Sequence, residues 1–111
     1  MRITWLGHAC FKLTSDSGVS VITDPFDERV GYDLPKESAD IVTVSHQHYD
    51  HNYIEAVEGS PQVIDKAGDF SIKAISIKGI KSYHDDKSGS ERGSNIIYKI
   101  EMDGIKICHC G

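Results

Sequence analysis

Apolar and polar residues alternate over short stretches along most of this chain, and this period of two predicts β-strands rather than helices. The stretches are bounded by glycine, proline, aspartate or serine, the residues that favour turns. The pattern predicts strands over residues 2–6, 10–14, 19–23, 41–44, 62–65, 70–77, 95–102 and 105–109. Between the last two, Asp103-Gly104 is a strong signal for a two-residue hairpin turn.

Helical signals are sparse by comparison. Only residues 52–58, which end before Gly59, have reasonable support for a helix. Residues 26–40 contain proline and glycine breaks and are typical of a long loop that could rim a functional site. The sequence therefore predicts an α+β fold class: a mostly antiparallel or mixed β-sheet with one or two short helices.

The densest chemistry follows the apolar run at residues 41–44. His46, His48, Asp50 and His51 place three imidazoles and a carboxylate, the ligand types that zinc prefers, within six residues. If the strand continues, His46 and His48 point to the same side of it and can converge on one ion. Asp50 and His51 follow where the chain should turn, so they suit a second ion beside the first.

Residues 46–51 also carry a family resemblance: they are similar to the H-x-H-x-D-H signature of the metallo-β-lactamase superfamily. Residues 3–11 and 21–26 resemble the first strands of that fold, and residues 93–111 resemble a later hairpin. The similarity runs along essentially the whole chain. It is strongest to the branch that contains L-ascorbate-6-phosphate lactonase and many Zn-dependent hydrolases.

This resemblance implies a metal-dependent hydrolase that acts through a metal-bound hydroxide. His84 corresponds to the third histidine of the first metal, beside His46 and His48, and Asp50 and His51 to ligands of the second. Asp50 would also be catalytic, positioning or accepting a proton from the metal-bound water. One or two Zn²⁺ ions are expected, with Mn²⁺, Ni²⁺ or Fe as alternatives. The bond cleaved would belong to an ester, lactone or phosphoester, with thioesters and β-lactams also open.

The chain departs from the family in length. Superfamily members stack two similar halves as an αββα sandwich, whereas residues 1–111 resemble one half only, with Gly111 just before the aspartate of an H-x-G-D element. We therefore expect a single half-domain, inactive alone, that forms a homo-oligomer or pairs with a missing second half, because one sheet face would otherwise be uncovered. The alternative is a non-catalytic metal-binding half-domain that persists by oligomerisation.

Composition narrows the range of partners. The net charge of −5 and the pI near 5.6 disfavour nucleic acid, so a small-molecule substrate is expected. The sequence contains no apolar run near the ~20 residues that a membrane span requires, which argues against a membrane protein. The chain opens directly into a strand pattern without a secretory signal, and this predicts a cytoplasmic location.

The cysteines do not form a disulfide framework, since there are three of them. Cys10 is expected to be a small buried hydrophobe. Cys108 and Cys110 share one face of a strand and could bind a metal as a Cys-x-Cys pair, but core packing or intermolecular oxidation is the favoured interpretation.

Three further side chains have open roles. His8 is expected to support a ligand or face substrate, and His109 to be either structural or a ligand. Asp24 could orient a ligating imidazole or serve in a turn. Lys87 and Arg92 are expected to be solvated loop charges.

Overall fold

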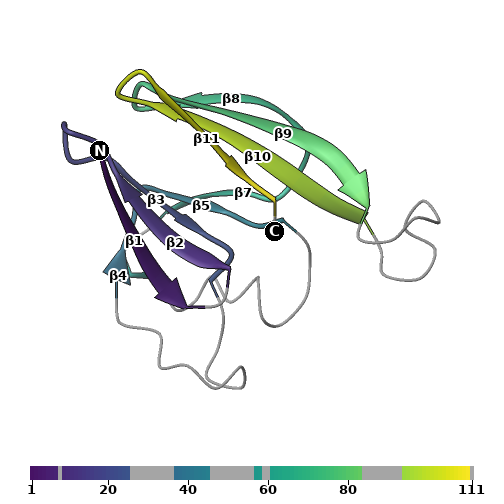
Figure 1. Ribbon diagram of the computed structural model, residues 1–111, viewed down its shortest axis with the longest axis horizontal. Helices are drawn as coiled ribbons and strands as arrows, with labels where there is room; N and C mark the ends of the chain where they lie inside the picture. The colour runs from purple at the N-terminus through teal and green to yellow at the C-terminus, as the bar shows by residue number, and fades with distance from the viewer. Residues whose placement is uncertain (8, 26–36, 46–56, 59–60, 84–93, 111) are drawn as a thin grey trace.

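The computed structural model describes residues 1–7, 9–25, 37–45, 57–58, 61–83 and 94–110, and these form β-strands joined by turns (Figure 1). The strands are β1 (Arg2–Gly7), β2 (Cys10–Thr14), β3 (Ser20–Thr23), β4 (Glu37–Ser38), β5 (Ile41–Thr43), β6 (Val57–Glu58), β7 (Gln62–Ile64), β8 (Gly68–Ile72), β9 (Ile75–Tyr83), β10 (Ser94–Met102) and β11 (Ile105–His109).

The first sheet is mixed and has the order β1-β2-β3-β5-β7. Strands β1, β2 and β3 are antiparallel neighbours, whereas β3, β5 and β7 are parallel. Strands β3 and β5 are buried on both faces because Val21 and Ile41 point to one side and Ile22 and Val42 to the other. The parallel pairing brings the carboxyl ends of β3 and β5 to the same edge.

The second sheet is antiparallel, with the order β11-β10-β9-β8. The predicted turn at Asp103-Gly104 is confirmed: both residues have left-handed backbones, with φ of 53° and 74°, and Met102 pairs with Ile105. Strands β4 and β6 form a separate parallel pair.

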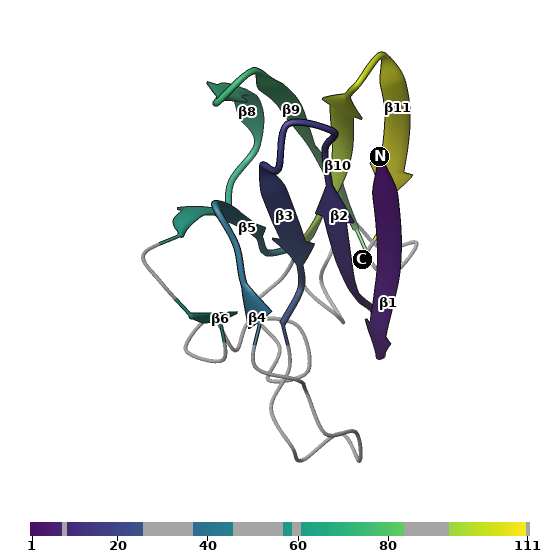
Figure 2. The ribbon, with the colours of Figure 1, turned by 90° about the vertical axis from the view of Figure 1, so that its left-hand side faces the viewer.

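The main hydrophobic core lies between the two larger sheets, which form separate layers in Figure 2. Its buried side chains come from both layers: Leu13, Val21, Ile41 and Ile64 from the first sheet and Ile75, Ile77, Tyr98, Ile100 and Met102 from the second. A smaller cluster on the other face of the first sheet contains the fully buried Cys10, which confirms its expected role as a small hydrophobe.

The predicted α+β class is wrong for the described part of the chain, which contains strands and no helix. The mixed and antiparallel sheets of that prediction are present. The expected helix at residues 52–58 ends in β6, where Val57 pairs with Glu37; residues 52–56 lie outside the described range. Pairing with a distant segment outweighs a weak local helix preference, and a β-branched valine suits it. Within the same described residues, nothing forms a helix long and apolar enough to cross a membrane.

The single strand predicted for residues 70–77 is also wrong. The chain reverses at Lys73 and Ala74, which have left-handed backbones with φ of 49° and 67°, so β8 and β9 form a hairpin with Ile72 paired to Ile75. Neither residue is among the usual formers of such a turn, so the local sequence does not mark it.

Candidate functional site

The residues predicted to bind metal lie outside the described residues: His46, His48, Asp50, His51 and His84. The same holds for His8, expected to support a ligand or face substrate, and for the loop charges Lys87 and Arg92. The structure does describe the residues that flank them. Ser45 precedes His46, Tyr83 precedes His84, and Ala9 follows His8.

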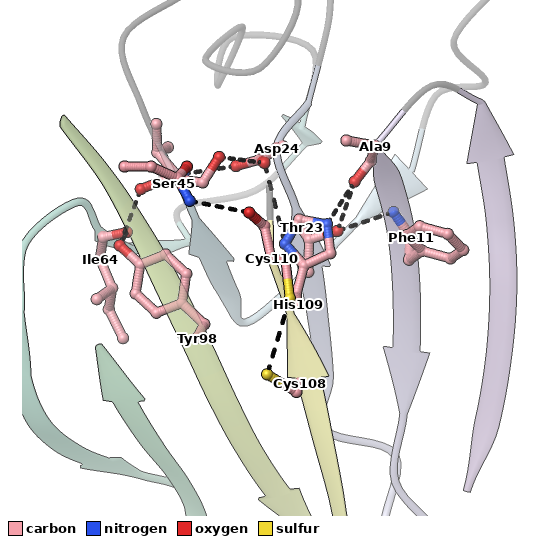
Figure 3. Close-up of polar contacts among 12 residues, drawn as sticks. Ala9, Phe11, Thr23, Asp24, Ser45, Ile64, Tyr98, Cys108, His109 and Cys110 are labelled. Atoms are coloured by element: carbon pink, nitrogen blue, oxygen red, sulfur yellow. Dashed lines mark hydrogen bonds and ion pairs between the residues drawn. The ribbon is translucent and has the colours of Figure 1, made fainter. Parts of the chain in front are cut away.

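Asp24 holds the chain directly before the His46 segment. It follows β3 with a left-handed backbone (φ 42°) and is fully buried. Its Oδ1 accepts a hydrogen bond from the Ser45 N–H at 2.7 Å, and its Oδ2 accepts one from the Ser45 hydroxyl at 2.6 Å (Figure 3). The Asp24 N–H donates to the Thr43 carbonyl at 2.8 Å. The Asp24 carboxylate thus fixes backbone geometry between the ends of β3 and β5.

His109 lies on the other side of this carboxylate. Its Nε2 is 2.9 Å from the carbonyl oxygen of Ala9, which also accepts a hydrogen bond from the Thr23 hydroxyl at 3.0 Å. Because a carbonyl only accepts, Nε2 carries a proton. Nδ1 is buried, has no hydrogen-bond partner among the residues that the structure describes, and lies 3.9 Å from Asp24 Oδ2. His109 therefore joins β11 to the segment after His8, which is a structural use of the ring.

The second sheet anchors the same region through β10. The Tyr98 hydroxyl lies 2.8 Å from the Val44 carbonyl and 3.0 Å from the Ile64 carbonyl, so its proton is directed to the ends of β5 and β7 (Figure 3). Burial raises the pKa of Tyr98, which keeps the hydroxyl protonated as a donor. The Ile96 N–H donates to the Ser45 carbonyl at 2.8 Å. The backbone that leads into His46 is thus fixed from both sheets.

Strand pairing also places the residue before His84 beside β10. Tyr83, the last residue of β9, pairs with Ser94 of β10. Ser94 is two residues from Ile96, the residue that contacts Ser45. Ser45 and Ala9, the described neighbours of His46 and His8, thus contact Asp24 and His109, and the strand that leads to His84 pairs with β10, which also contacts Ser45.

Among the residues that the structure describes, no group of three or more histidine, cysteine, aspartate or glutamate side chains could hold a metal ion. The candidate donors are those of residues 46–51 and His84. Their chemistry, four imidazoles and one carboxylate, suits zinc and neighbouring transition metals. By residue type, this donor set fits a transition-metal centre.

Residues 2–111 match the family model of the β-lactamase superfamily domain. The chain belongs to this superfamily. Its resemblance to the metallo-β-lactamase superfamily, based on the H-x-H-x-D-H signature, is confirmed.

Relatives and solved structures agree with this assignment. The chain is 33% identical over 106 residues to a UPF0173 metal-dependent hydrolase of Methanoculleus marisnigri, covering 96% of this chain and 40% of the relative. A UPF0173 metal-dependent hydrolase of Methanocaldococcus jannaschii is 30% identical over 109 residues, with coverage of 95% and 44%. The chain thus spans less than half the length of these two relatives.

Among solved structures, a Thermotoga maritima protein assigned as a Zn-dependent hydrolase of the metallo-β-lactamase superfamily has 42% identity and a TM-score of 0.76, covering 98% of this chain and 48% of that one. A Parabacteroides distasonis protein assigned as a metal-dependent hydrolase has a TM-score of 0.74 at 21% identity, which shows a shared fold alone; coverage is 98% and 59%.

The superfamily motif was readable from the sequence, but the residues that support it were not. Tyr98 belongs to an alternating strand pattern in which nothing marks it as a polar anchor. Ser45 stands next to the motif, and its hydroxyl is the one sequence signal that could have suggested a partner for Asp24. These residues act through long-range contacts that local patterns do not encode.

The favoured core-packing role of Cys108 and Cys110 is wrong. Both side chains are exposed, because Ile107 and His109 take the inward positions of β11, and Cys108 and Cys110 alternate with them. The two sulfur atoms are 4.0 Å apart.

Proposed function

We propose that this chain forms the part of a metal-dependent hydrolase that carries the H-x-H-x-D-H ligands. The observation that supports this most directly is the pair of buried hydrogen bonds from Ser45 to Asp24, which fix the backbone immediately before His46. Ligating groups are effective when the surrounding structure sets their orientation. Relatives that cover nearly all of this chain are named metal-dependent hydrolases.

In this proposal His46, His48 and His84 hold the first ion, and Asp50 and His51 contribute to a second. Zinc bound there would supply Lewis-acid activation of a water molecule and of the scissile bond. Asp50 positions the attacking water and accepts its proton. Zinc is the ion proposed first, because imidazole and carboxylate suit it and one structural relative is assigned as Zn-dependent.

The described residues contribute positioning. Asp24 holds Ser45, and Tyr98 holds Val44, so the residues before the motif cannot shift without breaking buried hydrogen bonds. His109 holds the Ala9 carbonyl next to His8. The proposed substrate is a small molecule with an ester, lactone or phosphoester bond, in the cytoplasm, rather than nucleic acid or a membrane lipid.

A second candidate, a non-catalytic metal-binding half-domain that persists by association, is supported by the surface near β1. Trp5 and Ile3 on this edge strand are 59% and 55% exposed. Nearby, Ile3, Phe11 and Ile107 help to line a largely apolar pocket of about 150 Å³ between β1, β2 and β11. A homo-oligomer, or a further segment corresponding to the unmatched part of the relatives, would cover this surface.

The test combines metal analysis with catalysis. We expect stoichiometric zinc after dialysis, and cleavage of p-nitrophenyl acetate, a lactone or bis-p-nitrophenyl phosphate that is lost in His48→Ala. Stoichiometric metal without turnover in the wild-type chain would favour the binding module. Equal cleavage rates in wild type and His48→Ala would remove the hydrolase proposal, and absence of metal would remove both.

A further inference from the structure

Two exposed thiols lie together at the end of β11. Cys108 and Cys110 are both exposed, and their Sγ atoms are 4.0 Å apart (Figure 3). His109, between them, points to the inner face, where its Nε2 bonds to Ala9. The pair is therefore separate from the His109–Asp24 contacts that support the candidate hydrolase site.

The spacing of the sulfur atoms suits an ion that bridges them. Two metal–thiolate bonds of about 2.3 Å span 4.0 Å when the angle at the metal is about 120°, the angle of a three-coordinate ion whose third position an external ligand would fill. No rearrangement of the strand is needed for such a bridge. A disulfide is a poorer match, because residues two apart on a strand are separated by about 6.6 Å, close to the upper limit for disulfide-bonded Cα atoms.

The backbone around the pair is held in place. Cys108 pairs with Lys99 in the β10–β11 ladder, and the Asn95 side-chain amide donates to the Cys110 carbonyl at 2.9 Å. These contacts oppose the contraction that a disulfide would require. They also reduce the conformational entropy lost when both sulfur atoms bind one ion.

The surrounding charge favours an anionic complex. Two thiolates around a monovalent cation carry a net charge of −1. Lys99 stands directly opposite Cys108 on the neighbouring strand, so both side chains project from the same face. The pKa of Cys108 is raised, first by burial and then by its hydrogen bond with Cys110, while Lys99 opposes the rise. Binding of the ion must therefore displace protons.

We propose that Cys108 and Cys110 form a binding site for a soft, low-coordinate cation, Cu(I) above all. Soft thiolate ligands select Cu(I) and zinc, but a structural zinc site needs four ligands. The described residues offer no third histidine, cysteine or carboxylate grouped with this pair. Cu(I) is satisfied by two or three soft donors. The site is open to solvent, which suits capture or transfer of the ion.

The experiment is an anaerobic competition for Cu(I) against bathocuproine disulfonate, with the reduced chain confirmed by a count of its three thiols. We expect the wild-type chain to remove one equivalent of Cu(I) from the chelator. Cys108→Ser and Cys110→Ser should each weaken binding by about 100-fold or more, because the second thiolate binds intramolecularly. Because Cys108 and Cys110 are both exposed, we expect the two variants to fold, and circular dichroism verifies this.

Two control proteins locate the ion. Cys10→Ala removes the buried thiol outside the pair, and His46→Ala/His48→Ala removes two imidazoles of the proposed hydrolase site; both should retain Cu(I) affinity within a few-fold of wild type. X-ray absorption should show sulfur ligands in the wild-type complex. Failure of the wild type to take Cu(I), unchanged affinity in the two serine variants, or loss of binding in the histidine variant would each overturn the proposal.

Discussion

Asp24 shows how one buried carboxylate can fix the backbone between two strand ends. Its two carboxylate oxygens accept the two donors of Ser45, one from the backbone and one from the side chain. The left-handed backbone of Asp24 (φ 42°) is a conformation that aspartate and asparagine tolerate better than most residues. The residue type is thus set by conformation and hydrogen bonding together.

Asp24→Asn tests this role with little change of shape. The amide keeps one acceptor but presents N–H donors in place of the second, so one Ser45 donor loses its partner. We expect unfolding free energy to fall by about 1–3 kcal/mol, measured by urea denaturation, and zinc affinity to fall with it, measured by chelator competition.

The matched control is Asp16→Asn, a carboxylate that is 80% exposed and bonded to the N-terminus. Its effect should stay within about 0.5 kcal/mol, as is usual for surface sites, with zinc affinity unchanged. If Asp24→Asn proves as mild as this control on both measurements, the positioning role of Asp24 is refuted.

At the scale of elements, two hairpins of the second sheet differ in whether their turn residues favour the turn conformation. Asp103-Gly104 is a turn signal that the structure confirms, whereas Lys73-Ala74 makes a turn with the same signs of φ from residues that do not favour it. An alanine at φ 67° is strained by its Cβ. The β8–β9 turn persists because nine-residue β9 pairs on both sides, with β8 and β10.

Ala74→Gly should relieve this strain. We expect a gain of about 1 kcal/mol in unfolding free energy, read from the urea midpoint at constant slope. Gly104→Ala is the converse control: it has φ 74° and open space around an added Cβ, so its loss of about 1 kcal/mol would be conformational alone. Destabilisation by Ala74→Gly would contradict the assigned backbone.

At the scale of the whole molecule, an ion pair links the β8–β9 turn to Asp40, the residue directly before β5 of the first sheet. Lys73 Nζ lies 2.6 Å from Asp40 Oδ1, and the Ser20 N–H donates to Asp40 Oδ2 at 3.0 Å. The hydrogen bond from Lys73 lowers the pKa of Asp40, and that from Ser20 adds to it. Because the pKa is lower in the folded than in the unfolded chain, this stabilisation is present above about pH 4.

Stability should therefore fall as pH drops from about 4 through the folded pKa of Asp40. Asp40→Asn should lose at most about 1 kcal/mol at pH 7, since the side chain of Lys73 is 58% exposed and solvent screens the pair. The deficit should shrink in acid, as urea denaturation across pH 2–7 would reveal. A deficit that persists undiminished at low pH would contradict the linkage; Asp69→Asn, an exposed carboxyl on β8, serves as control.

The predictability of the fold and the site follows from the range of the interactions. Strands such as β2 and β11 were predicted at their observed bounds because alternation and turn residues are local. The β8–β9 turn and β6 were missed because partners distant in sequence impose them. The roles of Asp24 and His109 stayed undecided in the sequence because each depends on Ser45 or Ala9, residues brought near only by sheet packing.

The sequence by itself determined the superfamily, the ligand types in residues 46–51 and most of the strands. Motif spacing and the period of the side chains depend only on residues close together in the sequence. The tertiary structure alone decided that Asp24 holds Ser45, that Tyr98 ties the two sheets together at Val44, and that Cys108 and Cys110 face solvent. Burial and hydrogen-bond partners arise when distant strands pack, and no local pattern carries that information.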